Sequence, residues 1–229
     1  MNAAEHIASN YFIRFDFADF FPSITGRVLR DFLRKSASAG LVDADDVVIA
    51  AVVRLACRAV GTNGLALTIG APSSPYFSNA LLHDFDAAVS AAASAAGVVY
   101  TRYADDIYLS SRGLADLDDF EGRFRHLVLE HLPFLRINED KVQHLSRKRR
   151  VTVTGVNITP DRKLSVGRDR KRKIKTLLFL VKSGALEAGR FSSLRGDIAY
   201  VRSIEPDFID RLERKFGREF IHNFMIGNL

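Results

Sequence analysis

The sequence predicts an α+β protein, in which an antiparallel sheet with packed helices is followed by a small helical domain. Residues 11–17 alternate between apolar and polar side chains, as in a half-buried strand. Residues 98–111 form two β-rich runs around a short turn, which is typical of a hairpin. Near the C-terminus, apolar residues recur at helical spacing. We therefore expect a first domain at residues 1–160 and a second, helical domain at residues 161–229.

The strand at residues 11–17 is the first expected element. Its residues Ile13, Phe15 and Phe17 alternate with Arg14 and Asp16, so Asp16 should point away from the aliphatic face. After it we expect two helices, a loop, a stiff turn rich in Gly and Pro, and one long helix, at residues 27–35, 43–59, 61–64, 70–75 and 76–96.

The second half of the chain begins with the hairpin. Val98 to Tyr103 and Ile107 to Ser111 are its two runs. A helix at residues 117–132 should pack against the sheet, because its apolar positions have helical spacing. We then expect one strand and two amphipathic helices, at residues 151–158, 174–181 and 208–216.

The composition is that of a folded protein, with 229 residues and 47% hydrophobic content. The only cysteine, Cys57, cannot form an internal disulfide, which favours a reducing cytoplasm. The first residues combine neither a basic leader nor an apolar core, and no long uncharged apolar run occurs. We expect a cytoplasmic protein without a membrane partner.

The positive charge is concentrated in one segment. Residues 141–175 contain thirteen Lys or Arg against two Asp, a local balance of +11, whereas the whole chain carries +6. A basic segment on an otherwise acidic body is typical of a protein that binds a phosphate backbone. Taken alone, it is equally well explained as a solvated surface.

Asp105 and Asp106 are adjacent carboxylates in the expected hairpin turn. Like charges so close repel each other unless a cation is present. The pair alone would more often be a solvated turn, but Asp16 supplies a third carboxylate at or near the end of a strand. Hard oxygen ligands of this kind suit Mg²⁺, which also accepts substrate phosphates as ligands.

Three segments resemble the sequence motifs of reverse transcriptases, in the same order and with similar spacing. Motif A is similar to Phe15-Asp16-Phe17-Ala18-Asp19-Phe20-Phe21-Pro22-Ser23-Ile24. Motif B resembles Gly70-Ala71-Pro72-Ser73-Ser74-Pro75 with Ser78-Asn79, and motif C resembles Tyr103-Ala104-Asp105-Asp106. The resemblance implies an α+β palm, covering motifs A to E, at residues 1–160, and a helical thumb at residues 161–229.

The resemblance extends to the retron reverse transcriptases of bacteria. Their Asn-Ala-x-x-His element matches residues 2–6, and their Val-Thr-Gly element matches residues 153–155. Residues 193–200 and 204–206 are also similar to a retron thumb. The resemblance therefore covers nearly the whole chain.

By this resemblance, Asp16, Asp105 and Asp106 would bind two Mg²⁺ ions, with Mn²⁺ as an alternative. Lys141 would protonate the departing pyrophosphate, although its position also fits a plain surface lysine. The residues expected at the deoxynucleoside triphosphate are Phe17, Phe21, Ala71 and Pro72. Phe21 would exclude a 2′-hydroxyl, whereas without the motif a core phenylalanine explains it equally well.

The resemblance also implies nucleic-acid contacts by the basic segment. The residues expected there are Arg147, Lys148, Arg149, Arg150, Thr154, Arg170, Lys171, Arg172 and Lys173. Thr154 would take part in recognising the cognate RNA; otherwise it is an ordinary strand residue. The partners implied are a structured noncoding RNA, which acts as template and primer, and its DNA product.

Retron enzymes carry a fingers region ahead of the Asn-Ala-x-x-His element, and this chain begins at that element. The fingers could be encoded on a second polypeptide, lost to a misassigned start codon or absent because the chain is a remnant. We expect the isolated chain to be weakly active or inactive, and to gain activity from a partner that supplies the fingers. The resemblance further implies an effector protein and a role in antiviral defence. The alternative function is a non-catalytic RNA-binding scaffold subunit that retains the palm.

Overall fold

The computed structural model describes residues 2–60 and 64–228. Contacts divide the chain into an N-terminal unit, Asn2 with residues 4–146, and a C-terminal unit, Ala3 with the residues from 147 onward. The boundary between the two units lies after Ser146, earlier in the chain than the expected boundary at residue 160. The reason is that the strands after residue 150 pair with a strand that leads directly into the first C-terminal helix.

A four-stranded antiparallel sheet forms the centre of the N-terminal unit, and it confirms the expected strand and hairpin. Its order is β4-β5-β1-β6. The strands are β4 (Val99–Tyr103), β5 (Asp106–Ser111), β1 (Tyr11–Asp16) and β6 (Gln143–Ser146). β1 is a central strand, and since its side chains alternate between the faces it buries Phe12 on one face and Ile13 and Phe15 on the other.

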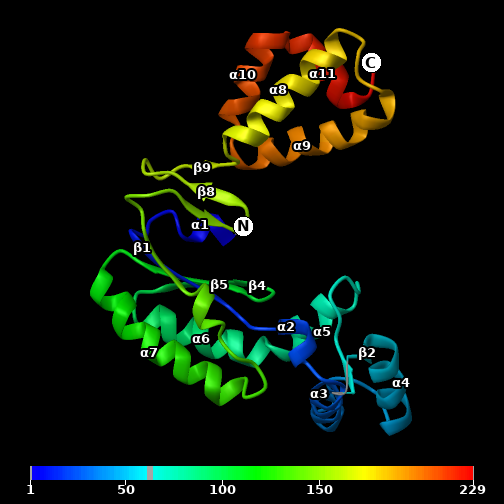
Figure 1. Cartoon of the computed structure of the whole chain (residues 1–229), viewed down its shortest axis with the longest axis vertical. Coiled ribbons are helices and arrows are strands. Elements are labelled where there is room, and N and C mark those ends of the chain that lie inside the picture. Colours follow the sequence, from blue (N-terminus) through cyan, green and yellow to red (C-terminus); the bar gives the residue numbers. More distant parts are fainter. Residues whose placement is uncertain (1, 61–63, 229) are drawn as a thin grey trace. The chain divides into compact units, whose positions relative to one another are not determined.

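Two helices, α6 (His83–Ala95) and α7 (Leu114–His131), lie side by side against one face of this sheet (Figure 1). The predicted stripe of α7 is buried, and its Phe124 ring lies 4.7 Å from the ring of Phe15 and 6.2 Å from that of Phe85. The predicted packing of this helix on the sheet is confirmed, and the aromatic cluster packs α7 against β1 on the face that the helices cover.

The remaining N-terminal elements surround this core. They are α1 (Asn2–Glu5), α2 (Phe20–Ser23), α3 (Gly26–Ser38), α4 (Asp46–Ala56), β2 (Arg58–Ala59), β3 (Leu65–Ala66), α5 (Ser74–Leu81) and the 3₁₀ helix η1 (Glu139–Lys141). Two expectations were wrong. The helix expected at residues 43–59 ends at Ala56, because the next residues pair with β3, and the helix expected at 76–96 is broken at Leu82. The expected loop at 61–64 lies mostly outside the described residues.

The C-terminal unit combines a small sheet with a helical bundle. Its elements are β7 (Val151–Val153), β8 (Val156–Ile158), β9 (Leu164–Ser165), α8 (Arg168–Lys182), the 3₁₀ helix η2 (Ala188–Arg190), α9 (Phe191–Ile204), α10 (Asp207–Phe216) and α11 (Arg218–Ile226). The single strand expected at residues 151–158 is a hairpin, because Thr154 and Gly155 adopt positive φ angles of 45° and 82°. The two predicted helical stripes face the interior: Ile174 and Leu178 of α8 and Phe208, Leu212 and Phe216 of α10 are buried, whereas Leu177, Val181 and Ile209 are half-buried.

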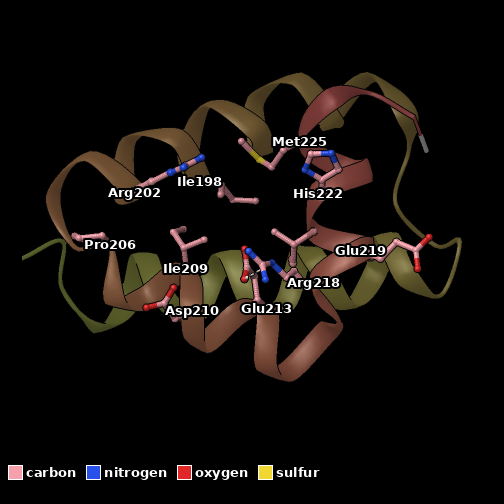
Figure 2. Close-up of a pocket in the computed structure, with 11 residues that line it drawn as sticks. Ile198, Arg202, Pro206, Ile209, Asp210, Glu213, Arg218, Glu219, His222 and Met225 are labelled. Carbon is pink, nitrogen blue, oxygen red and sulfur yellow. Dashed lines mark ion pairs between the residues drawn. The ribbon is translucent and has the colours of Figure 1, made fainter.

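No helix within residues 2–60 and 64–228 combines the length and apolar character needed to cross a bilayer. A cavity of about 750 Å³ lies between α9, α10 and α11, with Ile198 and Ile209 among its apolar residues and charges of both signs around it (Figure 2). None of the predicted site residues lines this cavity.

Candidate active site

The sheet brings the carboxylates of two predicted motifs together. Asp16, the last residue of β1, is the Cα partner of Asp106, the first residue of β5. Asp105 precedes Asp106 in the turn of the β4–β5 hairpin. Burial raises the pKa of the Asp106 carboxyl, and the charges of Asp105 and Asp16 raise it further, while a hydrogen bond from Arg14 opposes the rise. The charges of Asp16 and Asp105 therefore act on the Asp106 carboxyl.

Two cationic side chains bind this cluster. Arg14 Nε lies 2.6 Å from Asp106 Oδ1, and Lys141 Nζ lies 2.9 Å from Asp16 Oδ1. The hydrogen bond and charge of Asp16 raise the pKa of Lys141, so the ammonium form is favoured. Sequence reasoning singled out Lys141 but gave Arg14 no role, although its position two residues before Asp16 places both on the same face of β1.

Backbone pairing explains how Lys141 reaches Asp16. Asn138 N donates to the Asp16 carbonyl at 2.8 Å, and Ala18 N donates to the Arg136 carbonyl at 2.9 Å. The chain after α7 thus runs antiparallel to the end of β1, and η1 follows at once. Lys141, the last residue of η1, is delivered to the carboxylate by this pairing.

The donor set fits a hard divalent cation, although the carboxylates bind side chains here. Among the described residues, no group of three or more His, Cys, Asp or Glu side chains stands ready to hold a metal. Asp16, Asp105 and Asp106 nevertheless offer only oxygen ligands, as Mg²⁺ prefers. A cation bound to them would replace Arg14 and Lys141 as the partners of these oxygens.

The residues expected at the nucleotide lie within motif A and in the motif B turn. Phe17 is 2% exposed and its ring stacks on that of Phe20, so any nucleotide contact of Phe17 would come from its backbone. Phe21 is half-buried, with its ring 5.1 Å from that of Phe20. Ala71 is half-buried and Pro72 is exposed.

A buried serine holds the motif B turn. The Ser74 hydroxyl, which is fully buried, donates to the Thr68 carbonyl at 2.8 Å and accepts from the Thr68 amide at 3.3 Å. Gly70 within this turn has a φ of +86°, which favours glycine. The start of α5 is therefore fixed next to the expected nucleotide-binding turn.

Helix α8 divides the predicted nucleic-acid residues between two faces. One face forms a groove of about 320 Å³ with α10, lined by Arg168, Lys171, Arg172, Lys175, Phe208 and Arg211. On the face toward α9, Arg170 lies 4.6 Å from the centre of the Tyr200 ring and Lys173 lies 3.9 Å from Asp197. Only Lys171 and Arg172 of the four predicted α8 residues therefore line the groove.

Among the ion pairs of the described residues, Glu205 is the only carboxylate that binds a cation of this groove. It lies 2.9 Å from Lys171 Nζ and 2.9 Å from Arg211 Nη2. Sequence reasoning missed Arg211, because only the packing of α10 on α8 brings it to the basic segment.

The other predicted nucleic-acid residues lie on turns of the C-terminal unit. Lys148, Arg149 and Arg150 are exposed in the segment between β6 and β7, and Arg147 is half-exposed. Thr154 stands in the β7–β8 turn. Its positive φ is unusual for a β-branched residue and marks a strained position.

Comparison with known proteins identifies the family. Residues 1–158 match the reverse transcriptase (RNA-dependent DNA polymerase) family. The chain is 35% identical over 225 residues to the Retron Ec83 reverse transcriptase of Escherichia coli, covering 96% of this chain and 70% of that protein. It is 29% identical to the Retron Ec73 reverse transcriptase of Escherichia coli, covering 95% and 70%. For the Retron Mx65 reverse transcriptase of Myxococcus xanthus the identity is 28%, covering 93% and 51%.

Solved telomerases have a similar fold. The telomerase of Candida albicans in complex with a fragment of telomeric RNA aligns with a TM-score of 0.52 at 14% identity, covering 98% of this chain and 47% of that one. The apo telomerase of Candida tropicalis gives 0.52 at 10% identity, covering 96% and 48%. The chain thus spans about half the length of these telomerases, and the expected α+β palm with a helical thumb is confirmed. This chain belongs to the reverse transcriptase family of RNA-directed DNA polymerases, and within that family to the retron reverse transcriptases.

Proposed function

We propose that the protein copies a structured noncoding RNA into single-stranded DNA by metal-dependent nucleotidyl transfer. The opposition of Asp16 and Asp106 across β1 and β5, with Asp105 in the adjoining turn, is the observation that carries this proposal. Clustered carboxylates are unfavourable near a phosphate backbone unless they bind cations. A non-catalytic RNA-binding scaffold has no use for them.

Two Mg²⁺ ions, with Mn²⁺ as an alternative, are the proposed cofactors of Asp16, Asp105 and Asp106. When bound, the ions would activate the primer hydroxyl and stabilise the charge of the leaving pyrophosphate. Lys141 supplies the proton for that leaving group, because its ammonium already lies at the carboxylate cluster. Phe21 restricts the space at the sugar of the incoming deoxynucleotide.

The C-terminal unit binds the RNA and the growing duplex in this proposal. The groove of α8 and α10 presents five cationic side chains, and Lys148, Arg149 and Arg150 add exposed charge. Such surfaces bind nucleic acid through its phosphates and shape. Recognition by Thr154, priming by the RNA itself, action in the cytoplasm and a defence role with an effector stay predictions. The need for a second polypeptide that supplies the fingers is also a prediction. It can be tested by adding the product of the upstream reading frame to a polymerase assay.

Replacing both turn carboxylates tests the catalytic role. In cells that carry the complete locus, D105N/D106N should abolish the DNA product while the protein still binds its RNA. D118N/D119N is the matched control, because it removes the same two charges from an adjacent pair exposed on α7. Continued DNA synthesis by D105N/D106N would exclude catalysis at this site. RNA binding without DNA synthesis by the unaltered protein would favour the scaffold.

A further inference from the structure

The turn that carries Asp105 is conformationally strained. Tyr103 and Asp106 are paired, so Ala104 and Asp105 form a two-residue hairpin loop. Ala104 has a φ of +55°. Glycine is favoured at such a position, and a side chain there costs about 1–2 kcal/mol. A strained turn of this kind persists only where its surroundings hold it.

Arg102 holds the turn from within the sheet. Its side chain is only 6% exposed. Arg102 Nη1 donates to the Ala104 carbonyl at 3.1 Å and to Asn79 Oδ1, on α5, at 3.1 Å. One guanidinium nitrogen therefore connects the strained residue beside Asp105 to the helix that follows the motif B turn.

Asp86 on α6 fixes the guanidinium itself. Arg102 Nε donates to Asp86 Oδ1 at 2.8 Å and Nη2 donates to Oδ2 at 2.5 Å, a two-point contact that sets the plane of the group. Tyr100 also donates to Asp86 Oδ1, at 2.6 Å. Burial raises the pKa of Tyr100, so its hydroxyl remains a donor.

We propose that Arg102 is a positioning residue for catalysis, clamped by Asp86 so that it holds the Ala104 carbonyl and thereby orients Asp105 and Asp106. The inference rests on the proposed metal-binding role of those carboxylates. It requires the planar fork of arginine, because a lysine could neutralise Asp86 but could not bind Asp86, Asn79 and the turn carbonyl together. A purely structural ion pair would tolerate the lysine.

The R102K variant separates these two roles. It should melt within a few degrees of the unaltered protein, since a cation still faces Asp86. Its kcat should fall by about tenfold to a hundredfold, because small misplacements of catalytic groups have effects of that size. Mn²⁺ binding, followed by electron paramagnetic resonance of the free ion, should weaken, while KM for the template-primer stays unchanged. R34K is the matched control, because Arg34 donates to Asp46 at 2.8 Å on α3 and α4, away from the turn.

A second substitution tests the strain directly. Glycine at position 104 removes the penalty of the positive φ, so A104G should restore part of the Mn²⁺ affinity and kcat of R102K. Wild-type kcat and Mn²⁺ affinity in R102K would overturn the proposal, and so would a loss that A104G leaves unchanged. D105N/D106N distinguishes the two levels of failure. If that variant still synthesises DNA, the proposed function fails; if it does not, a wild-type R102K refutes only the role of Arg102.

Discussion

Asp16 and Asp106 oppose each other as Cα partners of β1 and β5, and each binds a different cation. Arg14 and Lys141 thereby balance the charge that the register of the sheet concentrates at the ends of two strands. The same cations would compete with divalent ions for the carboxylate oxygens. The strength of the ion pairs of Arg14 and Lys141 therefore influences how readily divalent ions replace them at the carboxylate oxygens.

We expect K141R to separate the ion pair of Lys141 from its proposed proton transfer. Arginine keeps a positive charge beside Asp16, but its guanidinium is too weak an acid to act as a proton donor. The rate of single-nucleotide incorporation should fall by about a hundredfold, with KM for the deoxynucleotide and the melting temperature little changed. A wild-type incorporation rate in K141R would show that only the charge matters.

Phe21 should control the choice of sugar. With F21V, the ratio of kcat/KM for deoxynucleotides to that for ribonucleotides should fall by at least about tenfold, because the smaller side chain leaves room for a 2′-hydroxyl. F32V, which truncates a half-buried ring on α3, serves as the control for general loss of packing. Equal discrimination in the two variants would count against the assignment.

The two faces of α8 should contribute differently to nucleic-acid binding. R172Q/K175Q removes two charges from the groove, whereas R170Q/K173Q removes two that contact Tyr200 and Asp197. Each lost phosphate contact lowers the slope of log affinity against log salt by about 0.7–0.9. The groove variant should therefore lower this slope by about 1.4–1.8 in filter-binding assays with the RNA, and the other variant should lower it much less. Equal losses would mean that both faces meet phosphate.

Local patterns were sufficient to predict the parts of the site that depend on one strand or one turn. Alternation in β1 and the hairpin runs predicted where Asp16 and Asp106 lie, since a strand has a period of two residues. The break at Leu82 could not be predicted, because the residues around it all tolerate a helix. The turn at Thr154 could not be predicted either, because a β-branched residue favours a strand.

Contacts between side chains that are far apart in the sequence could not be predicted, for a different reason. Lys141 meets Asp16 through backbone pairing between segments more than a hundred residues apart. Arg211 reaches the basic groove only through helix packing. Local propensity contains no information about either contact.

The strain at Thr154 predicts that stability and RNA recognition can be separated. Asparagine tolerates positive φ better than threonine, and Asn-Gly is the preferred pair in such a hairpin turn. T154N should raise the unfolding free energy of the C-terminal unit by about 0.5–1 kcal/mol in urea titrations. It should also weaken binding of the cognate RNA, whereas T154S, which keeps the hydroxyl, should bind normally. Unchanged RNA affinity in T154N would leave Thr154 as a plain turn residue.

His6 should make the stability of the N-terminal unit depend on pH. The ring is fully buried, with Nδ1 2.6 Å from the Ser110 hydroxyl and Nε2 2.8 Å from that of Thr101. Burial lowers the pKa of His6 from 6.5 to about 4. The unfolded chain therefore binds a proton more readily than the folded one, so the contribution is complete above pH 6.5 and is lost as the pH falls toward 4.

The expected size follows from this shift. Between pH 7 and pH 5 the stability that His6 contributes should fall by about 2 kcal/mol. The difference in unfolding free energy between the unaltered protein and H6Q should shrink by that amount over this range, because glutamine does not titrate. H126Q, which replaces an exposed histidine of α7, is the control for the effect of removing a histidine. A difference between the unaltered protein and H6Q that is constant with pH would show that His6 is not held neutral by burial.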